Sequence, residues 1–259
     1  MAHPPRFVWH DLNTTDSAAA QTFYGELFHW KFEKSDGPYV HIKAGDEMIG
    51  GIRAMGAGDK TPPSWLGYVG VDDVAATVDK MTKAGGNVLV PTMTMPNVGT
   101  FAVVADPSGA VMAPWKSARA GEDAELPGRP AMHTFCWDEL SSTNIEAATA
   151  FYTKTLGWTA QTMDMGGGMM YTLFKRPGVK DPTMPAEDRN AGGGMASPPE
   201  RPFSYWLAYV AVPSADNIVA MAGRLGGKAV VPAMDIPNVG RFAVLQDPQQ
   251  AMIAVLQPA

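Results

Sequence analysis

The sequence predicts an α+β fold of two similar halves, each built around a mostly antiparallel sheet. Residues 7–30 and 135–158 share an aromatic-rich pattern at an offset of 128 residues. A second match joins residues 96–109 to residues 237–250 at an offset of 141, with nine of its fourteen positions identical. The 27 glycines and 22 prolines of the 259-residue chain lie between short apolar segments, which is typical of proteins with many short strands. One mixed unit repeated in tandem accounts for these observations.

Each half is expected to contain the same elements in the same order. In the first half, alternating apolar and aromatic residues predict strands over 7–13, 39–43, 48–54, 65–71, 88–91, 100–105 and 111–115. The first helix begins after the capping residues Thr14, Thr15 and Asp16 and ends near Phe28. The second helix covers residues 72–83 and stops at Gly85-Gly86. Helices on one side of mostly antiparallel strands define the α+β class.

The repeat also sets the expected domain boundaries. Residues 1–116 form the predicted N-terminal domain and residues 132–259 the predicted C-terminal domain. Between them, residues 117–131 are charged, contain glycine and proline and lack periodicity, as a linker does. The two offsets differ by 13 residues, which places an insertion in the Gly- and Pro-rich stretch 164–199. This insertion could form a lid over a binding site in the second half.

Composition excludes several classes of protein. Hydrophobic residues make up 46% of the chain, and 20 Lys and Arg against 26 Asp and Glu leave a net charge of −6, so nucleic-acid binding is not expected. The single cysteine, Cys136, cannot form an intramolecular disulfide. The chain starts without an apolar signal segment and contains no 18-residue apolar run, so neither a secreted nor a membrane protein is predicted. We expect a cytoplasmic protein.

Three motifs carry a family resemblance: FYGELFHW with its counterpart FYTKTLGW, YVGVDDVAATVDKMTKAGG, and FAVVADPSG. At these residues the chain resembles the vicinal oxygen chelate superfamily, which includes glyoxalase I, bleomycin-resistance proteins and extradiol dioxygenases. More narrowly, it is similar to tandem-domain actinobacterial members, some of which are labelled hydroxylases or antigens. The resemblance implies four βαβββ modules, paired into two cupped sheets with a ligand site in each cup. It does not fix the function, because this fold supports several unrelated chemistries.

The resemblance also implies a divalent metal held by two histidines and a glutamate, but this chain lacks those side chains. The matching positions are Trp9, Leu66 and Ala113 in the first half and Trp137, Leu207 and Ala254 in the second. Since none of these side chains is a metal ligand, we predict no metal and no other cofactor. A metal held by His10 and His41 is the remaining alternative, although strand alternation opposes it. His29, at a helix end, is expected to be solvated, and His133 lies just beyond the linker.

Alternation along the first strand of each half predicts what faces the ligand. Phe7, Trp9 and Asp11 share one strand face, as do Phe135, Trp137 and Glu139 in the second half. If Trp9 occupies the metal-ligand position, this is the concave face. Asp11 and Glu139 are therefore candidate general acids or bases, since a carboxylate beside aromatic rings is desolvated. The alternative is that both carboxylates accept hydrogen bonds from nearby donors and have no catalytic role.

Further candidates lie on neighbouring strands. Tyr39 and Tyr171 could present a phenol to the ligand or pack in the core. Tyr68 and Tyr209 are expected to point into the cups, because each lies two residues after the position of the lost second metal ligand. Arg241 could bind an anionic group in the second cup, or it could be a solvated residue at a strand end.

Two functions remain open on the sequence alone. The first is a binding protein that holds a small apolar or aromatic molecule between aromatic walls, as bleomycin-resistance proteins do. The second is a metal-independent isomerase, lyase or hydroxylase-like enzyme that uses a buried carboxylate as general acid or base. Both make a small molecule the expected partner. The chain is expected to be a monomer or a homodimer.

Overall fold

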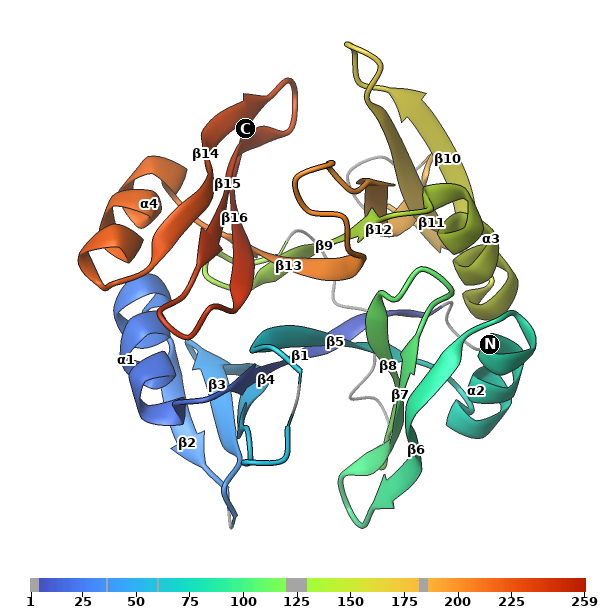
Figure 1. Ribbon diagram of the computed structural model, residues 1–259, viewed down its shortest axis with the longest axis horizontal. Coiled ribbons are helices and arrows are strands. Elements are labelled where there is room, and N and C mark those ends of the chain that lie inside the picture. Colours follow the sequence, from blue (N-terminus) through green and yellow to red (C-terminus); the bar gives the residue numbers. More distant parts are fainter. Residues whose placement is uncertain (1–4, 36, 60, 120–129, 182–185) are drawn as a thin grey trace. The chain divides into compact units, whose positions relative to one another are not determined.

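The computed structural model of the protein describes residues 5–35, 37–59, 61–119, 130–181 and 186–259. Four modules of the order βαβββ follow one another along the chain (Figure 1). The elements of the first half are β1 (Arg6–Thr14), α1 (Ser17–Phe28), β2 (Lys31–Lys34), β3 (Val40–Ala44), β4 (Glu47–Ala54), β5 (Ser64–Gly70), α2 (Val74–Lys83), β6 (Asn87–Met95), β7 (Gly99–Ala105) and β8 (Val111–Ser117).

The second half repeats this order with longer strands in its third module. Its elements are β9 (Phe135–Ser142), α3 (Ile145–Leu156), β10 (Thr159–Asp164), β11 (Met170–Lys180), β12 (Asp188–Ala196), β13 (Tyr205–Ala211), α4 (Ala215–Arg224), β14 (Lys228–Ile236), β15 (Gly240–Gln246) and β16 (Met252–Pro258). The predicted insertion lengthens β11 to 11 residues, against 5 in β3. Residues 182–185 of the predicted lid lie outside the described residues, and a lid function stays a prediction.

Each half contributes one eight-stranded sheet. The strand order is β2-β3-β4-β1-β5-β8-β7-β6 in the first and β10-β11-β12-β9-β13-β16-β15-β14 in the second. The last three strands of each module pair antiparallel in chain order. The first strand of each module pairs parallel with its last: β1 with β4, β5 with β8, β9 with β12 and β13 with β16. The predicted α+β class with four βαβββ modules and mostly antiparallel sheets is confirmed. No helix among the described residues is long and apolar enough to cross a membrane.

Several boundaries differ from the sequence prediction for local reasons. Strand β2 was not predicted because its sequence, KFEK, is largely exposed and lacks a run of alternating apolar residues. Helix α2 begins at Val74 because Asp73 is its N-cap and accepts a hydrogen bond from the Ala76 N–H at 2.9 Å. Most of the predicted linker falls on residues 120–129, outside the described residues, so the predicted domain boundaries remain untested.

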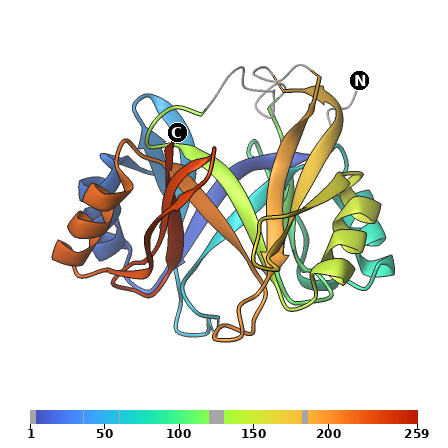
Figure 2. The same cartoon turned by 90° about the horizontal axis from the view of Figure 1, so that it is seen from above.

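Within the described residues, the chain divides into two compact units, and each unit draws elements from both halves. The first, here called the α1/α4 unit, contains α1 with β2 to β4 and α4 with β14 to β16. The second, the α2/α3 unit, contains α2 with β6 to β8 and α3 with β10 to β12. Strands β1, β5, β9 and β13 each run from one unit into the other. Figures 1 and 2 show α1 beside α4 in one unit and α2 beside α3 in the other.

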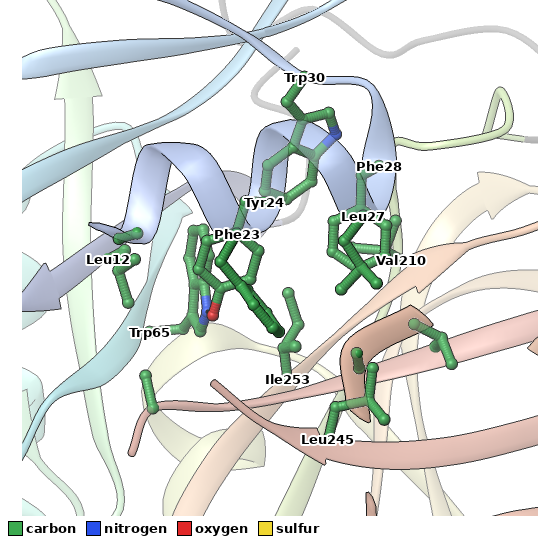
Figure 3. Packing of buried hydrophobic residues seen from close by; sticks show 14 of the residues in the cluster. Leu12, Phe23, Tyr24, Leu27, Phe28, Trp30, Trp65, Val210, Leu245 and Ile253 are labelled. Carbon is green, nitrogen blue, oxygen red and sulfur yellow. The ribbon is translucent and has the colours of Figure 1, made fainter. Parts of the chain in front are cut away.

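The core of the α1/α4 unit combines the first and fourth modules. Helix α1 buries an aromatic side that includes Phe23, Tyr24 and Phe28. The same cluster includes Ile52 from the first half. Figure 3 shows Leu12 of the first half in this cluster together with Val210, Leu245 and Ile253 of the second half. Burial of such side chains contributes about 1.5–3 kcal/mol each. Module one therefore depends on module four for its hydrophobic core.

The α2/α3 unit is built in the same way from modules two and three. Its core joins Val69 and Met112 of the first half to Phe151, Trp158 and Phe174 of the second. Helix α3 has the same aromatic pair as α1, because Phe151-Tyr152 repeats Phe23-Tyr24. The two units are thus related by the same repeat that the sequence displays.

A buried hydrogen-bond chain links the two halves inside each unit. In the α1/α4 unit, the Trp65 indole N–H donates to the Tyr24 hydroxyl at 3.1 Å, and this hydroxyl donates to Asp247 at 2.9 Å (Figure 3 shows Tyr24 and Trp65). In the α2/α3 unit, Trp206 donates to Tyr152 at 2.9 Å and Tyr152 donates to Asp106 at 3.0 Å. Burial, followed by the nearby carboxylate, raises the pKa of both tyrosines well above the ordinary value.

Candidate functional site

The two faces of strand β1 carry different chemistry. Leu12 is fully buried in the core beneath α1, together with Ile42 and Ile52 from neighbouring strands. Successive strand residues point to opposite faces, so Trp9 and Asp11 lie on the face turned away from α1. Asp11 pairs in register with Gly51 of β4, and Gly51 pairs with His41 of β3. These positions share that outer face with Trp9.

Four side chains, here called the Trp9 cluster, meet on this face: Trp9, Asp11, Tyr39 and His41. The Trp9 indole N–H lies 2.8 Å from Asp11 Oδ1 and 3.1 Å from the Tyr39 hydroxyl, and it donates to both. Tyr39 in turn donates to the same Asp11 oxygen at 2.6 Å. The His41 ring stands edge-on to Tyr39, with ring centroids 5.1 Å apart. One buried carboxylate, only 8% exposed, therefore orients two aromatic side chains.

A glycine on the adjacent strand makes room for this arrangement. A Cβ atom on Gly51 would lie 1.8 Å from the Tyr39 hydroxyl oxygen and 2.1 Å from its ring carbon Cζ. The Tyr39 phenol therefore lies directly over the backbone of β4, at the residue that pairs with Asp11. Any larger residue at position 51 would displace the phenol from the carboxylate.

The second half repeats the pair of carboxylate and phenol. Tyr171 donates to Glu139 Oε2 at 3.0 Å, and Gly193 pairs with Glu139 in register. A Cβ atom on Gly193 would lie 2.3 Å from the Tyr171 hydroxyl oxygen. Leu173 stands where the first half has His41. The structure therefore brings each candidate carboxylate together with its candidate tyrosine, and the role of these groups in function stays a prediction.

Phe7 and Phe135 lie elsewhere than expected. Phe7 packs in the core of the α2/α3 unit, with its ring centroid 5.0 Å from that of Trp206. Phe135 packs against the core of the α1/α4 unit and stacks on His10 with centroids 4.0 Å apart. The physical reason is that β1 and β9 each run from one unit to the other, so the two ends of each strand lie in different units. Alternation predicts the face on which a residue lies, but it does not predict what packs against that face.

Two further expected ligand contacts lie in aromatic surroundings. The Tyr68 ring centroid lies 6.2 Å from that of Phe101 and 6.0 Å from that of Trp115. The Tyr209 and Phe242 centroids are 6.5 Å apart. The adjacent residues Val69 and Val210 belong to the cores, so alternation turns both tyrosines to the opposite sheet face. Sequence reasoning missed Phe101, Trp115 and Phe242, although each lies on a strand it had predicted. Trp137 lies in β9, and its contact with a ligand stays a prediction.

Arg241 is held by two carboxylates. Its guanidinium binds Asp216 through two hydrogen bonds of 2.8 and 3.0 Å and donates to Asp235 at 3.0 Å. The hydrogen bonds that Arg241 donates to Asp216 and then to Asp235 raise the pKa of Arg241, and those to Asp216 lower the pKa of that carboxyl. An anionic ligand would therefore have to compete with both carboxylates for this cation.

The side chains at the family's metal-ligand positions do not fit a metal. The expected carboxylate positions are occupied by Ala113, which pairs in register with Tyr68, and by Ala254, which pairs with Tyr209. Each of these positions therefore carries only a methyl group. Indole and aliphatic groups at the other four positions offer no lone pair to a cation. Within the described ranges, no three His, Cys, Asp or Glu side chains are grouped so that they could hold a metal ion.

Comparisons with known proteins agree with this architecture. The model of the glyoxalase/bleomycin resistance protein/dioxygenase superfamily matches residues 6–112. The "Putative glyoxylase CFP32" of Mycobacterium tuberculosis is 36% identical over 258 residues, which cover 97% of this chain and 94% of that protein. The "Anthracycline biosynthesis protein DnrV" of Streptomyces peucetius is 30% identical over 270 residues, covering 96% and 92%. The chain belongs to the glyoxalase/bleomycin resistance protein/dioxygenase superfamily.

Solved structures show the same fold at low sequence identity. The Mn(II)-bound glyoxalase from Novosphingobium aromaticivorans matches with a TM-score of 0.63 at 15% identity, covering 99% of this chain and 83% of that one. The 2,3-dioxygenase LapB from Pseudomonas sp. KL28 matches with a TM-score of 0.65 at 13% identity, covering 100% and 94%. At these identities the likeness concerns the fold, and function has to be argued from the side chains.

Proposed function

We propose that the protein binds a planar aromatic small molecule on the sheet face that carries the Trp9 cluster, and that this binding requires no metal ion. The observation that carries the proposal is the hydrogen-bonded triangle of Trp9, Asp11 and Tyr39. Aromatic side chains bind flat ligands by stacking, and a fixed polar group sets the ligand's orientation. Because Asp11 fixes both rings, little side-chain entropy is lost when a ligand binds.

The class of ligand is supported by relatives of similar length. DnrV and the Streptomyces sp. protein DauV, each 30% identical to this chain, carry names that place them in anthracycline biosynthesis. Anthracyclines contain fused planar rings with ketone and hydroxyl groups. Such a molecule combines an aromatic face for Trp9 with polar groups that can exchange hydrogen bonds with Tyr39 and Asp11. We therefore propose a polycyclic aromatic ketone as the ligand class.

A second candidate function is proton transfer. The 2.6 Å hydrogen bond from Tyr39 to Asp11 supports it, and so does the recurrence of a phenol–carboxylate pair at Tyr171 and Glu139. A carboxylate paired with a phenol can take a proton from a bound substrate, as an isomerase, a lyase or a hydroxylase-like enzyme requires. Asp11 would be the base and Tyr39 the group that orients it.

Calorimetric titration with an anthracycline, combined with an assay for its turnover, separates the two candidates. Binding alone predicts that Tyr39→Phe weakens affinity about fivefold, because it removes one hydrogen bond worth about 1 kcal/mol. The matched variant Tyr171→Phe should leave this first site unchanged. Catalysis predicts instead that Asp11→Asn lowers turnover about 10²–10⁴-fold while affinity is nearly kept. An absence of saturable binding by the wild-type protein would contradict the proposed function.

A further inference from the structure

Two histidines meet at the C-terminal end of α1, in a region outside the Trp9 cluster. His29 is the C-cap of α1 and has a φ of 58°, and His133, which precedes β9, has a φ of 66°. This left-handed conformation is uncommon for residues other than glycine and costs a side-chain-bearing residue about 1 kcal/mol. The two rings are in contact, with centroids 5.5 Å apart.

The internal repeat shows that the fold does not need these imidazoles. At the equivalent positions the α2/α3 unit has Gly157, with a φ of 70°, and Pro5. The same indole-to-carbonyl hydrogen bond is made in both units. The indole of Trp158 donates to the Pro5 carbonyl at 2.7 Å, and the indole of Trp30 donates to the His133 carbonyl at 2.6 Å. Glycine, as at Gly157, is the residue that a left-handed C-cap favours, because it has no Cβ atom. His29 adopts the same backbone conformation with a side chain.

The distance between the rings suits a shared metal ion. A metal–nitrogen bond of about 2.0–2.1 Å places a histidine ring centroid about 3.2 Å from the metal. Two such rings at a tetrahedral angle have centroids about 5.2 Å apart. The observed separation is 5.5 Å, with an interplanar angle of 69°. His29 is exposed, so its ring is open to an ion from solution.

The polar groups of His133 also fit a ligand role. Its Nδ1 atom is buried and has no hydrogen-bond partner among the described residues. Its backbone is fixed, since the His133 N–H donates to the Ala211 carbonyl at 2.7 Å while its own carbonyl accepts from Trp30.

We propose that His29 and His133 bind one divalent late transition-metal ion, with water completing its coordination. Two imidazoles without thiolate suit Zn²⁺ or Cu²⁺ rather than Mg²⁺ or Ca²⁺. The ion would fasten the segment before β9 to the end of α1, inside the α1/α4 unit. This site contains none of the residues at the family's metal-ligand positions and does not depend on the proposed ligand.

The test is calorimetric titration of the untagged full-length protein with ZnCl₂, using variants that respect the backbone. His29→Gly installs the residue that the repeat uses, and His133→Asn keeps a residue that tolerates a left-handed φ. The wild-type protein should bind one Zn²⁺ per chain, and either variant should weaken binding by about tenfold or more. Without metal, His29→Gly should melt about 2–4 °C higher because backbone strain is relieved, and it should lose the rise in melting temperature that Zn²⁺ gives the wild type.

His41→Leu is the matched control, because the second half carries leucine at that position. It should leave Zn²⁺ binding unchanged. With Cu²⁺ as the probe, electron paramagnetic resonance should report nitrogen ligands that His29→Gly removes. Three results would each overturn the proposal: no Zn²⁺ binding by the wild type, undiminished binding by both variants, or loss of binding in His41→Leu. The last would place the ion at the Trp9 cluster and would also contradict metal-independent ligand binding.

Discussion

At the scale of single residues, the buried hydroxyls of Tyr24 and Tyr152 each form hydrogen bonds that join the two halves of the chain. The hydroxyl of Tyr24 accepts from Trp65 and donates to Asp247, which belongs to the other half of the chain. The Tyr24→Phe variant leaves a buried indole N–H and a buried carboxylate oxygen without this partner. Each loss costs about 1–3 kcal/mol, so we expect the free energy of unfolding to fall by about 2–6 kcal/mol in urea titration.

Tyr152→Phe should have an effect of similar size, since Trp206 and Asp106 make the equivalent bonds. Tyr205→Phe is the control, because Tyr205 lies partly exposed beside Phe203 and should change stability by less than about 0.5 kcal/mol. If the two buried variants are no less stable than this control, the hydrogen-bond chains do not hold the cores.

Asp247 gives the α1/α4 unit a stability that depends on pH. Burial raises the pKa of Asp247, and hydrogen bonds from Tyr24 and from the backbone N–H groups of the turn offset part of this rise. The folded state therefore holds the proton more tightly than the unfolded state. The resulting stabilisation is complete below the ordinary pKa of 3.8 and is lost as pH rises through the higher folded-state pKa.

The variant Asp247→Asn removes this titration. We expect the wild type's advantage in unfolding free energy over Asp247→Asn to shrink as pH rises from about 4 to about 7. Urea unfolding at a series of pH values measures the difference. A difference that stays constant or grows with pH would show that burial of Asp247 is not coupled to its ionisation.

At the scale of elements, strand β4 determines whether the Trp9 cluster can form. In Gly51→Ala, the new methyl group would overlap the Tyr39 phenol, whose oxygen lies 1.8 Å from the ideal Cβ position. We expect this variant to lose about 1–3 kcal/mol of unfolding free energy and to weaken binding of the anthracycline probe.

Adding Tyr39→Ala to Gly51→Ala should restore most of the lost stability, because the overlapping ring is gone. Gly58→Ala is a suitable control, since no atom lies within 4 Å of its ideal Cβ position. Equal stability of Gly51→Ala and Gly58→Ala would mean that Tyr39 does not lie against β4 in solution.

The elements also show what a sequence can reveal. The repeat and the apolar periodicity predicted the helices and most strands, because those residues bury one face against a core. Strand β2 was not predicted because its residues are largely exposed and mostly charged. The pairing of Asp11 with Tyr39 and of Glu139 with Tyr171 joins strands far apart in sequence, and only the sheet register brings them together.

The carboxylate partners of Tyr24 and Tyr152 were not predicted either, although the FY motif that contains the tyrosines and the DP motif that contains the carboxylates both recur in the sequence. Periodicity assigns a residue to a face, but it does not say which module covers that face. For the same reason, Phe7 and Phe135 were assigned to the ligand, whereas Phe7 lies in one core and Phe135 packs against the other.

At the scale of the whole molecule, each hydrophobic core needs both halves of the chain. Helix α1 packs with Val210, Leu245 and Ile253, which lie far beyond the predicted N-terminal domain. We therefore expect residues 1–116 expressed alone to self-associate or to lack cooperative unfolding. Mixing them with residues 132–259 should restore a cooperative transition, measured by circular dichroism. A monomeric, cooperatively folded fragment 1–116 would show that the first half is self-sufficient.

At this scale we propose that the Trp9 cluster on the first sheet binds a flat aromatic ligand without a metal ion. The most direct measurement is calorimetric titration of an anthracycline into protein dialysed against a chelator, for the wild type and for Asp11→Asn. We predict saturable binding by the metal-free wild type and weaker binding by the variant. Binding that appears only after Mn²⁺ is added back, or that is equal in the two proteins, would contradict the account.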